Sequence, residues 1–231
     1  AIFSAIYSSQ FMKPWLKSIV KPIMEIMASL PSVVLGFLAA LWFAPLFEAR
    51  VPSIILFFVL APGLAMIVGA ILGRLPVRYK TWCPPGYEFF WFIPLLALIC
   101  YLAWAGGPIL EQTVFTVKDP TSGQMIGDFR LWWPEFTGTP FNQRNAMVVG
   151  FFMGFAVIPI IFTVSEDALS NVPRTLTSGS LALGASRWQT AVRVVLPTAS
   201  AGIFSACMIG LGRAVGETMI VLMATGNTPV K

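Results

Sequence analysis

The sequence contains no histidine and few charged residues. Only 11% of its 231 residues are charged, against about 25% in an ordinary soluble domain. Without histidine, imidazole acid–base catalysis and histidine metal ligation are excluded, and three cysteines are too few for the usual four-ligand zinc site. We therefore expect no metal, no cofactor and no catalytic residue. Hydrophobic residues instead make up 57% of the chain and the mean hydropathy is +0.79, which indicates an integral membrane protein.

The cysteines and the basic residues are distributed as expected for a membrane protein. Cys100 and Cys207 lie within apolar runs and Cys83 follows a basic loop, so none has a convincing disulfide partner. The net charge of +5 comes from short basic groups that flank apolar segments. This pattern is typical of membrane orientation, so we expect no nucleic-acid binding.

Five apolar segments have about the length needed to cross roughly 30 Å of hydrocarbon. They are residues 23–47, 51–72, 89–105, 146–164 and 200–223. The sequence thus predicts an all-α membrane protein with about five full transmembrane helices, and one membrane domain over residues 1–231. Since the chain begins at Ala1 without a methionine, we expect a fragment.

Basic residues orient these segments. Lys13, Lys17 and Lys21 recur every four residues between apolar ones, which predicts an amphipathic helix over residues 13–22 in contact with membrane lipids, with a solvated loop as the alternative. Because Arg74, Arg78 and Lys80 should remain in the cytoplasm, alternation places the loop 106–145 outside and the segment 165–197 inside. Residues 131–134 (LWWP) favour an interfacial anchor over a docking patch for an external partner.

The segment 180–197 is amphipathic and cationic. Gly184 supplies a turn that other residues resist, and Pro197 lacks the N–H needed to continue a helix. This predicts two short helices in a compact elbow that lies against a partner, with an ordinary cytoplasmic linker as the alternative.

Arg213 and Glu217 lie in the last apolar segment, four residues apart. A bare arginine at the bilayer centre costs at least roughly 2.5 kcal/mol, so it should face a protein interior or an aqueous cavity. Arginine presents a fork of donors that suits tetrahedral oxyanions. We interpret both residues as lining an anion pathway, with Thr218 as a weaker polar contact; a structural ion pair is the alternative.

Three stretches of the chain resemble the permease (transmembrane) subunits of phosphate-specific ABC importers. Residues 31–37 (PSVVLGF) are similar to one signature of that family, and residues 212–219 (GRAVGETM) to another. Residues 182–190 (ALGASRWQT) and 194–197 (VVLP) resemble its cytoplasmic coupling loop, in which glycine precedes Leu-Pro.

The resemblance implies a type I ABC importer permease-like helical bundle whose coupling loop, residues 165–197, docks on the ATPase. Compared with short family members, residues 51–145 look like an inserted transmembrane hairpin. The Glu-Ala-Ala element of the loop is absent, and Ser178, Gly179 and Ser180 replace it. The implied coupling residues are Glu166, Asp167, Ser178, Gly184, Ala185, Arg187, Leu196 and Pro197.

The function implied by the resemblance is import of inorganic phosphate through a bacterial inner (plasma) membrane by alternating access. The implied partners are cytoplasmic ATP-binding subunits, a second permease subunit and a periplasmic phosphate-binding protein. The chain has no Gly-x-x-x-x-Gly-Lys-Ser/Thr loop, so we expect a transport subunit that is not itself an enzyme. The alternatives are a permease for another oxyanion (sulfate, molybdate or phosphonate) and a structural or signalling membrane subunit.

Overall fold

A computed structural model describes residues 1–74, 88–118 and 124–225, with side chains undescribed at 72–74 and 88–92. The chain divides into two compact units, which we call the terminal unit (Ala1–Leu41 with Arg144–Lys231) and the central unit (Trp42–Gln143). The predicted basic-loop residues Arg78 and Lys80, and Cys83, lie outside the described residues.

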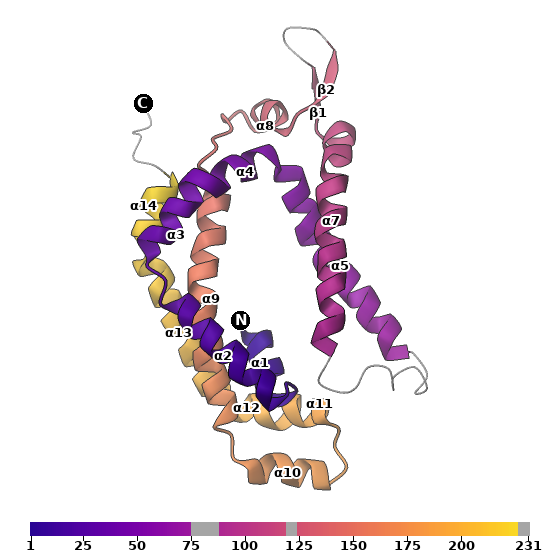
Figure 1. Cartoon of the computed structure of the whole chain (residues 1–231), viewed down its shortest axis with the longest axis vertical. Coiled ribbons are helices and arrows are strands. Elements are labelled where there is room, and N and C mark those ends of the chain that lie inside the picture. Colours follow the sequence, from indigo (N-terminus) through magenta and orange to yellow (C-terminus); the bar gives the residue numbers. More distant parts are fainter. Residues whose placement is uncertain (75–87, 119–123, 226–231) are drawn as a thin grey trace. The chain divides into compact units, whose positions relative to one another are not determined.

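The terminal unit is built from helices (Figure 1). They are α1 (Ile2–Gln10), α2 (Pro14–Ala28), α3 (Ser32–Leu38), α9 (Ala146–Ser170), α10 (Arg174–Ala182), α11 (Arg187–Thr190), the π-helical turn η2 (Ala191–Val195), α12 (Leu196–Thr198), α13 (Ser200–Gly216) and α14 (Met219–Thr225). A second π-helical turn, η1 (Ala39–Phe43), continues α3 across the boundary between the units.

Helix α9 is the centre of the terminal unit. Its N-cap is Asn145, whose Oδ1 accepts hydrogen bonds from the backbone N–H groups of Met147 and Val148, as favourable N-caps do. The helix packs against α1, α2, α13 and α14. The buried apolar cluster lies where α9 ends and the elbow begins, and consists of Ala5, Phe162, Leu169, Val172, Val195 and Ala199.

The region of the first predicted span, residues 23–47, is divided between the end of α2 and the continuous helical segment Ser32–Ala49. Helix α2 runs without a break through the predicted boundary at residues 22–23 and ends at Ala28, and Pro31 is the N-cap of α3. Proline restricts the residue before it to extended backbone, so a break replaces the expected kink. Residues 14–28 are helical and not a loop. On α2 the side chains of Trp15, Ile19 and Ile23 are exposed.

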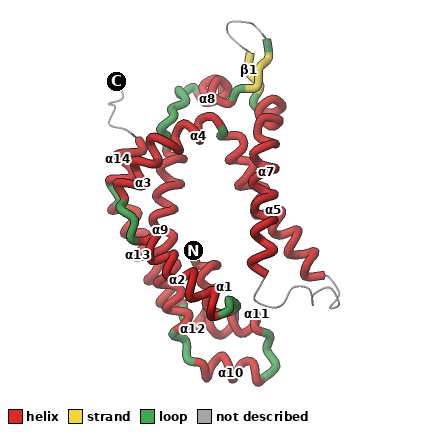
Figure 2. The backbone as a smooth tube through the Cα atoms, in the orientation of Figure 1, coloured by secondary structure: helices red, strands yellow, loops and turns green. Residues whose placement is uncertain are grey.

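Helices and a small hairpin make up the central unit. The elements described in it are α4 (Ala44–Ala49), α5 (Val51–Arg74), α7 (Glu88–Val114), β1 (Thr116–Lys118), β2 (Met125–Gly127) and α8 (Phe129–Thr137). The strands pair antiparallel, with Val117 opposite Ile126. Figure 2 shows this hairpin in yellow against the red helices; the sequence did not predict it.

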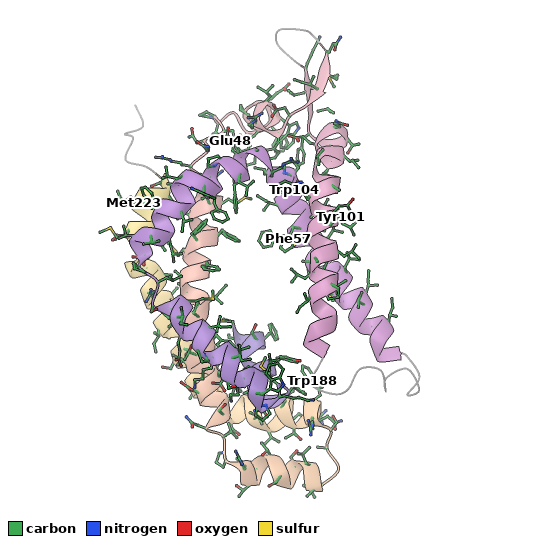
Figure 3. The ribbon with its side chains drawn as sticks, in the orientation of Figure 1. Glu48, Phe57, Tyr101, Trp104, Trp188 and Met223 are labelled. Carbon is green, nitrogen blue, oxygen red and sulfur yellow. The ribbon has the colours of Figure 1, made fainter. Side chains whose placement is uncertain are left out.

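Helix α7 continues nine residues beyond the predicted span, which was expected to end at Ala105. The first part of this extension packs against α5. A Cβ at Gly107 would lie 1.8 Å from Ser53 Oγ, so the two helices meet closely there, as small residues permit. The Arg50 guanidinium also lies 4.4 Å from the centre of the Trp104 ring (Figure 3), a cation–π contact between the start of α5 and α7.

The helices fit the predicted membrane class. Among the described residues, four segments are long and apolar enough to cross a membrane: Ser32–Ala49, Val51–Ile71, Ile93–Val114 and Ala146–Ser170. A fifth is possible if Arg187–Thr198 and Ser200–Gly216, bent by 68°, form one span. The prediction of a helical membrane protein with about five spans is confirmed.

The predicted outer loop contains a small aromatic module. The Phe115 ring centre lies 5.0 Å from that of Phe129 and 4.9 Å from that of Trp132. Asp128 caps α8 by accepting from the backbone N–H of Arg130 at 2.8 Å, and a hydrogen bond to the same carboxylate raises the pKa of the Arg130 guanidinium. These contacts tie residues 131–134 into a folded module, and both interpretations of that stretch remain predictions.

Candidate functional site

The predicted elbow is a pair of short helices closed by glycine. Helix α10 ends at Ala182, and Gly184 follows with φ +87, a conformation that glycine adopts without a steric penalty. Ser186 then caps α11: its Oγ accepts from Gln189 N at 3.2 Å, while its own N–H donates to Gln189 Oε1 at 2.8 Å. This reciprocal pair is a capping box.

Two further contacts hold the elbow in place. The hydroxyl groups of Ser180 and Thr190 lie 3.0 Å apart and join α10 to α11. The Trp188 ring centre lies 6.3 Å from that of Phe11, which follows α1 (Figure 3). Val195 is fully buried in the apolar cluster beneath. The elbow is therefore fixed to the end of α9, while the choice between a partner-binding elbow and an ordinary linker remains a prediction.

The outer surface of the elbow is apolar and cationic. Leu183 is 91% exposed and Trp188 62% exposed, although large apolar side chains gain by burial. Arg174, Arg187 and Arg193 are also exposed. The sequence from residue 168 to residue 216 contains no aspartate or glutamate, so this surface has one sign of charge.

The predicted coupling residues divide into two groups. Six of them lie on the elbow. Four are exposed (Ser178, Gly184, Arg187 and Pro197), and two are half-buried (Ala185 and Leu196). Glu166 and Asp167 lie elsewhere, near the end of α9, where they face α2. Glu166 is only 1% exposed, so it does not belong to the exposed elbow surface. The role of all eight residues in coupling remains a prediction.

Arg213 lies on the face of α13 that is turned toward α9. Ala206 and Gly210 precede it by seven and three residues, so the three share one helical face; both are buried. A Cβ at Gly210 would lie 2.4 Å from a side-chain carbon of Ile161 in α9. Arg213 is half-buried one turn further along, and its Nε is buried with no hydrogen-bond partner among the described residues.

Glu217 does not share a continuous helix with Arg213. Helix α13 ends at Gly216, and Glu217 has extended backbone with ψ 102. Its Oε1 accepts from the backbone N–H of Ile220 at 3.4 Å, so it faces the start of α14, where a negative charge is favourable. Within the described chain no ion pair joins it to Arg213. Thr218 contributes its carbonyl, which accepts from Leu222 N.

Sequence reasoning missed three features of this region. It expected one helix over residues 200–223, whereas the chain breaks at Glu217–Thr218. It did not single out Leu183. It also treated the lysines of α2 as lipid- or solvent-facing, whereas Lys17 and Lys21 contact α9. The one available signal was the four-residue spacing of those lysines, which matches that of two polar residues near the end of α9, Glu166 and Ser170.

The comparisons with known proteins agree with this architecture. Residues 65–231 match the family of binding-protein-dependent transport system inner membrane components. The chain belongs to this family. It is therefore a multi-pass membrane protein of the permease class, as the resemblance in its motifs predicted.

Individual relatives of this permease carry more specific names. Phosphate transport system permease protein PstC 1 of Mycobacterium bovis is 44% identical over 89 residues, 38% of this chain and 26% of that protein. PstC of Haemophilus influenzae is 25% identical over 224 residues, 97% of this chain and 50% of that protein. PstA 1 of Mycobacterium tuberculosis is 31% identical over 136 residues, 57% of this chain and 43% of that protein. The chain thus spans between a quarter and a half of these relatives.

Proposed function

We propose that this permease is a transmembrane subunit of an ATP-driven importer of inorganic phosphate. The observation that carries the proposal is the unpartnered Nε of the Arg213 guanidinium. The names of the relatives, phosphate transport system permease proteins, support phosphate as the anion.

The guanidinium is available to a solute because the neighbouring carboxylate is used elsewhere. Glu217 accepts from the first turn of α14 and forms no ion pair with Arg213 in the described structure. A partly buried cation without a counter-ion in an apolar segment is unfavourable, so Arg213 has an electrostatic preference for an anion. Its planar fork of N–H donors matches the oxygens of phosphate. Arg213 is the anion contact, and Glu217 and Thr218 shape the break in the helix beside it.

The elbow is the surface that meets the ATP-hydrolysing subunit. Leu183 fills an apolar groove on that subunit, and the exposed arginines face acidic side chains around the groove. An apolar anchor with a charged rim is the usual anatomy of a specific interface. Residues 165–197 then form the coupling loop, and Glu166 and Asp167 act in it indirectly, through α2.

The remaining subunits follow from this assignment. A periplasmic binding protein delivers phosphate, a second permease subunit completes the passage, and ATP is hydrolysed on separate cytoplasmic subunits. The spans open alternately to either side of the bacterial inner membrane. Residues 51–145 are an inserted hairpin, which agrees with the compactness of Trp42–Gln143. The second candidate is a permease for sulfate, molybdate or phosphonate, since a guanidinium suits any tetrahedral oxyanion.

Replacement of Arg213 tests the pathway. In the complete transporter reconstituted in liposomes, Arg213→Gln should lower ATP-dependent uptake of labelled phosphate at least about tenfold, because one charge-assisted hydrogen bond of roughly 1.5 kcal/mol is lost. Arg213→Lys retains the charge without the planar fork of donors, so its uptake rate should lie between those of the wild type and of Arg213→Gln.

The matched control is Arg144→Gln, which removes an exposed arginine just before α9 and should leave uptake unchanged. Gel filtration establishes whether each variant complex assembles. Wild-type uptake by an assembled Arg213→Gln complex would show that Arg213 is structural and that the anion takes another route.

A further inference from the structure

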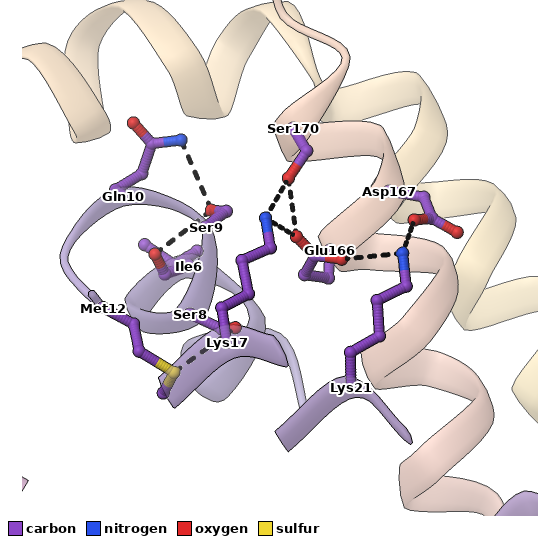
Figure 4. Close-up of polar contacts among 10 residues, drawn as sticks. All are labelled: Ile6, Ser8, Ser9, Gln10, Met12, Lys17, Lys21, Glu166, Asp167 and Ser170. Carbon is purple, nitrogen blue, oxygen red and sulfur yellow. Dashed lines mark hydrogen bonds and ion pairs between the residues drawn. The ribbon is translucent and has the colours of Figure 1, made fainter. Parts of the chain in front are cut away.

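A cluster of charged and polar groups joins α2 to the end of α9 (Figure 4). Lys17 Nζ forms an ion pair with Glu166 Oε1 and donates to Ser170 Oγ at 3.0 Å, and Ser170 Oγ donates to Glu166 Oε1 at 2.6 Å. Lys21 Nζ donates to Asp167 Oδ1 at 2.7 Å and lies 3.4 Å from Glu166 Oε2. These five residues, which we call the α2–α9 cluster, connect segments about 150 positions apart.

Burial makes Glu166 the centre of this cluster. Its side chain is 2% exposed, against 31% for Lys17 and 37% for Lys21. A buried carboxylate is tolerated when opposite charges and hydrogen bonds surround it, and here both come from α2 and Ser170. The hydrogen bond to Asp167 also raises the pKa of Lys21, as do the two carboxylate charges, against the opposing effect of burial. Lys21 is therefore charged at neutral pH.

The spacing of the charges fixes the alignment of the two helices. Lys17 and Lys21 are one turn apart on α2, and Glu166 and Ser170 are one turn apart on α9. A slip of α2 along α9 would leave the Glu166 charge without a partner. The cluster therefore allows α2 and the end of α9 to move together more readily than past each other.

The two helices that the α2–α9 cluster joins have different neighbours. The end of α9 is joined by the buried apolar cluster to η2 of the elbow. Helix α2 leads through Ser29–Pro31 to α3, which packs on α14. At that crossing a Cβ on Gly36 would lie 2.9 Å from the Cβ of Met223 (Figure 3). Helix α14 begins at Met219, directly after the break beside Arg213.

Two routes therefore lead from the elbow to the two sides of the break at Glu217–Thr218. One follows the chain through α12 and α13 to Arg213. The other passes through the α2–α9 cluster, α2 and α3 to α14. We propose that Glu166 is a positioning residue that transmits displacement of the elbow to α14, so that α13 and α14 move relative to each other and change the access of an anion to Arg213. This inference rests on the proposed function.

The test measures how much phosphate enters for each ATP hydrolysed by the complete transporter in liposomes. Glu166→Gln retains the shape of the side chain and removes its charge, so this ratio should fall by about threefold or more, the scale on which residues between coupled sites act. The matched control is Glu25→Gln, the same change at an exposed position of α2 that has no ion pair in the described structure; its ratio should equal that of the wild type.

A merely structural role would give a different result. Loss of folded complex lowers uptake and ATP hydrolysis in proportion, which leaves the ratio unchanged, and that outcome for Glu166→Gln would overturn the proposal. Lys17→Arg should retain the ratio, whereas Lys17→Met combined with Lys21→Met should lower it; equal ratios for the two would also overturn it. Absence of phosphate uptake by the wild-type complex would instead contradict the proposed function.

Discussion

At the scale of single residues, the elbow depends on the backbone freedom of Gly184. Its φ of +87 lies in the left-handed region, and an added Cβ would meet no atom within 4 Å. Gly184→Ala should therefore act through backbone strain alone, about 1–2 kcal/mol, and weaken binding of the proposed ATP-hydrolysing subunit to the permease. Isothermal titration with the purified subunit in detergent measures this affinity.

Gly179 provides the control for that prediction. An added Cβ at Gly179 would likewise meet no atom within 4 Å, but this glycine lies within α10 and has no positive φ. Gly179→Ala should leave the affinity unchanged or raise it slightly, because alanine favours helix over glycine by roughly 1 kcal/mol. Equal losses in the two variants would mean that the left-handed turn is not what the partner requires.

At the scale of elements, the α3–α14 crossing depends on the absence of a side chain at Gly36. A Cβ there would lie 2.9 Å from the Met223 Cβ and 3.1 Å from the Met219 carbonyl oxygen, neither of which is the flexible end of a side chain. Gly36→Ala should force the helices apart at a cost of roughly 1–3 kcal/mol. Thermal unfolding of the complex should shift to lower temperature.

The comparison for this crossing is Gly154→Ala in α9, where an added Cβ meets nothing within 4 Å. That variant should unfold at the wild-type temperature or above it. If the unfolding temperature of Gly36→Ala were no lower than that of Gly154→Ala, α3 and α14 would not be in close contact at Gly36.

The elements also show what the sequence could and could not predict. Long apolar runs predicted α5 and α9, because few other structures bury so many apolar residues in succession. The continuation of α7 beyond Ala105 was missed, and the contact between Gly107 and Ser53 in that part joins residues more than 50 positions apart, which no local pattern reveals. Lys17 was also misjudged for this reason. Its four-residue spacing from Lys21 was visible in the sequence, but its distant partner Glu166 was not. Arg213 could be singled out because an arginine among apolar residues requires a partner, but the break at Glu217 had no clear local signal.

At the scale of the whole molecule, the terminal unit holds every element of the proposed mechanism. The elbow, the α2–α9 cluster and Arg213 all belong to Ala1–Leu41 or Arg144–Lys231. The motifs that resemble phosphate permeases also lie in this unit. The proposed mechanism therefore assigns coupling and anion passage to one compact body, and residues 51–145, the proposed inserted hairpin, have no role in it.

The most direct test of phosphate import is ATP-dependent uptake of labelled anions by the complete wild-type transporter in liposomes that contain its binding protein. Phosphate, sulfate and molybdate are supplied in turn at equal concentration. We predict that phosphate accumulates and that unlabelled sulfate or molybdate does not compete with it. Accumulation of sulfate or molybdate in preference to phosphate, or no ATP-dependent accumulation of any anion, would contradict the proposed function.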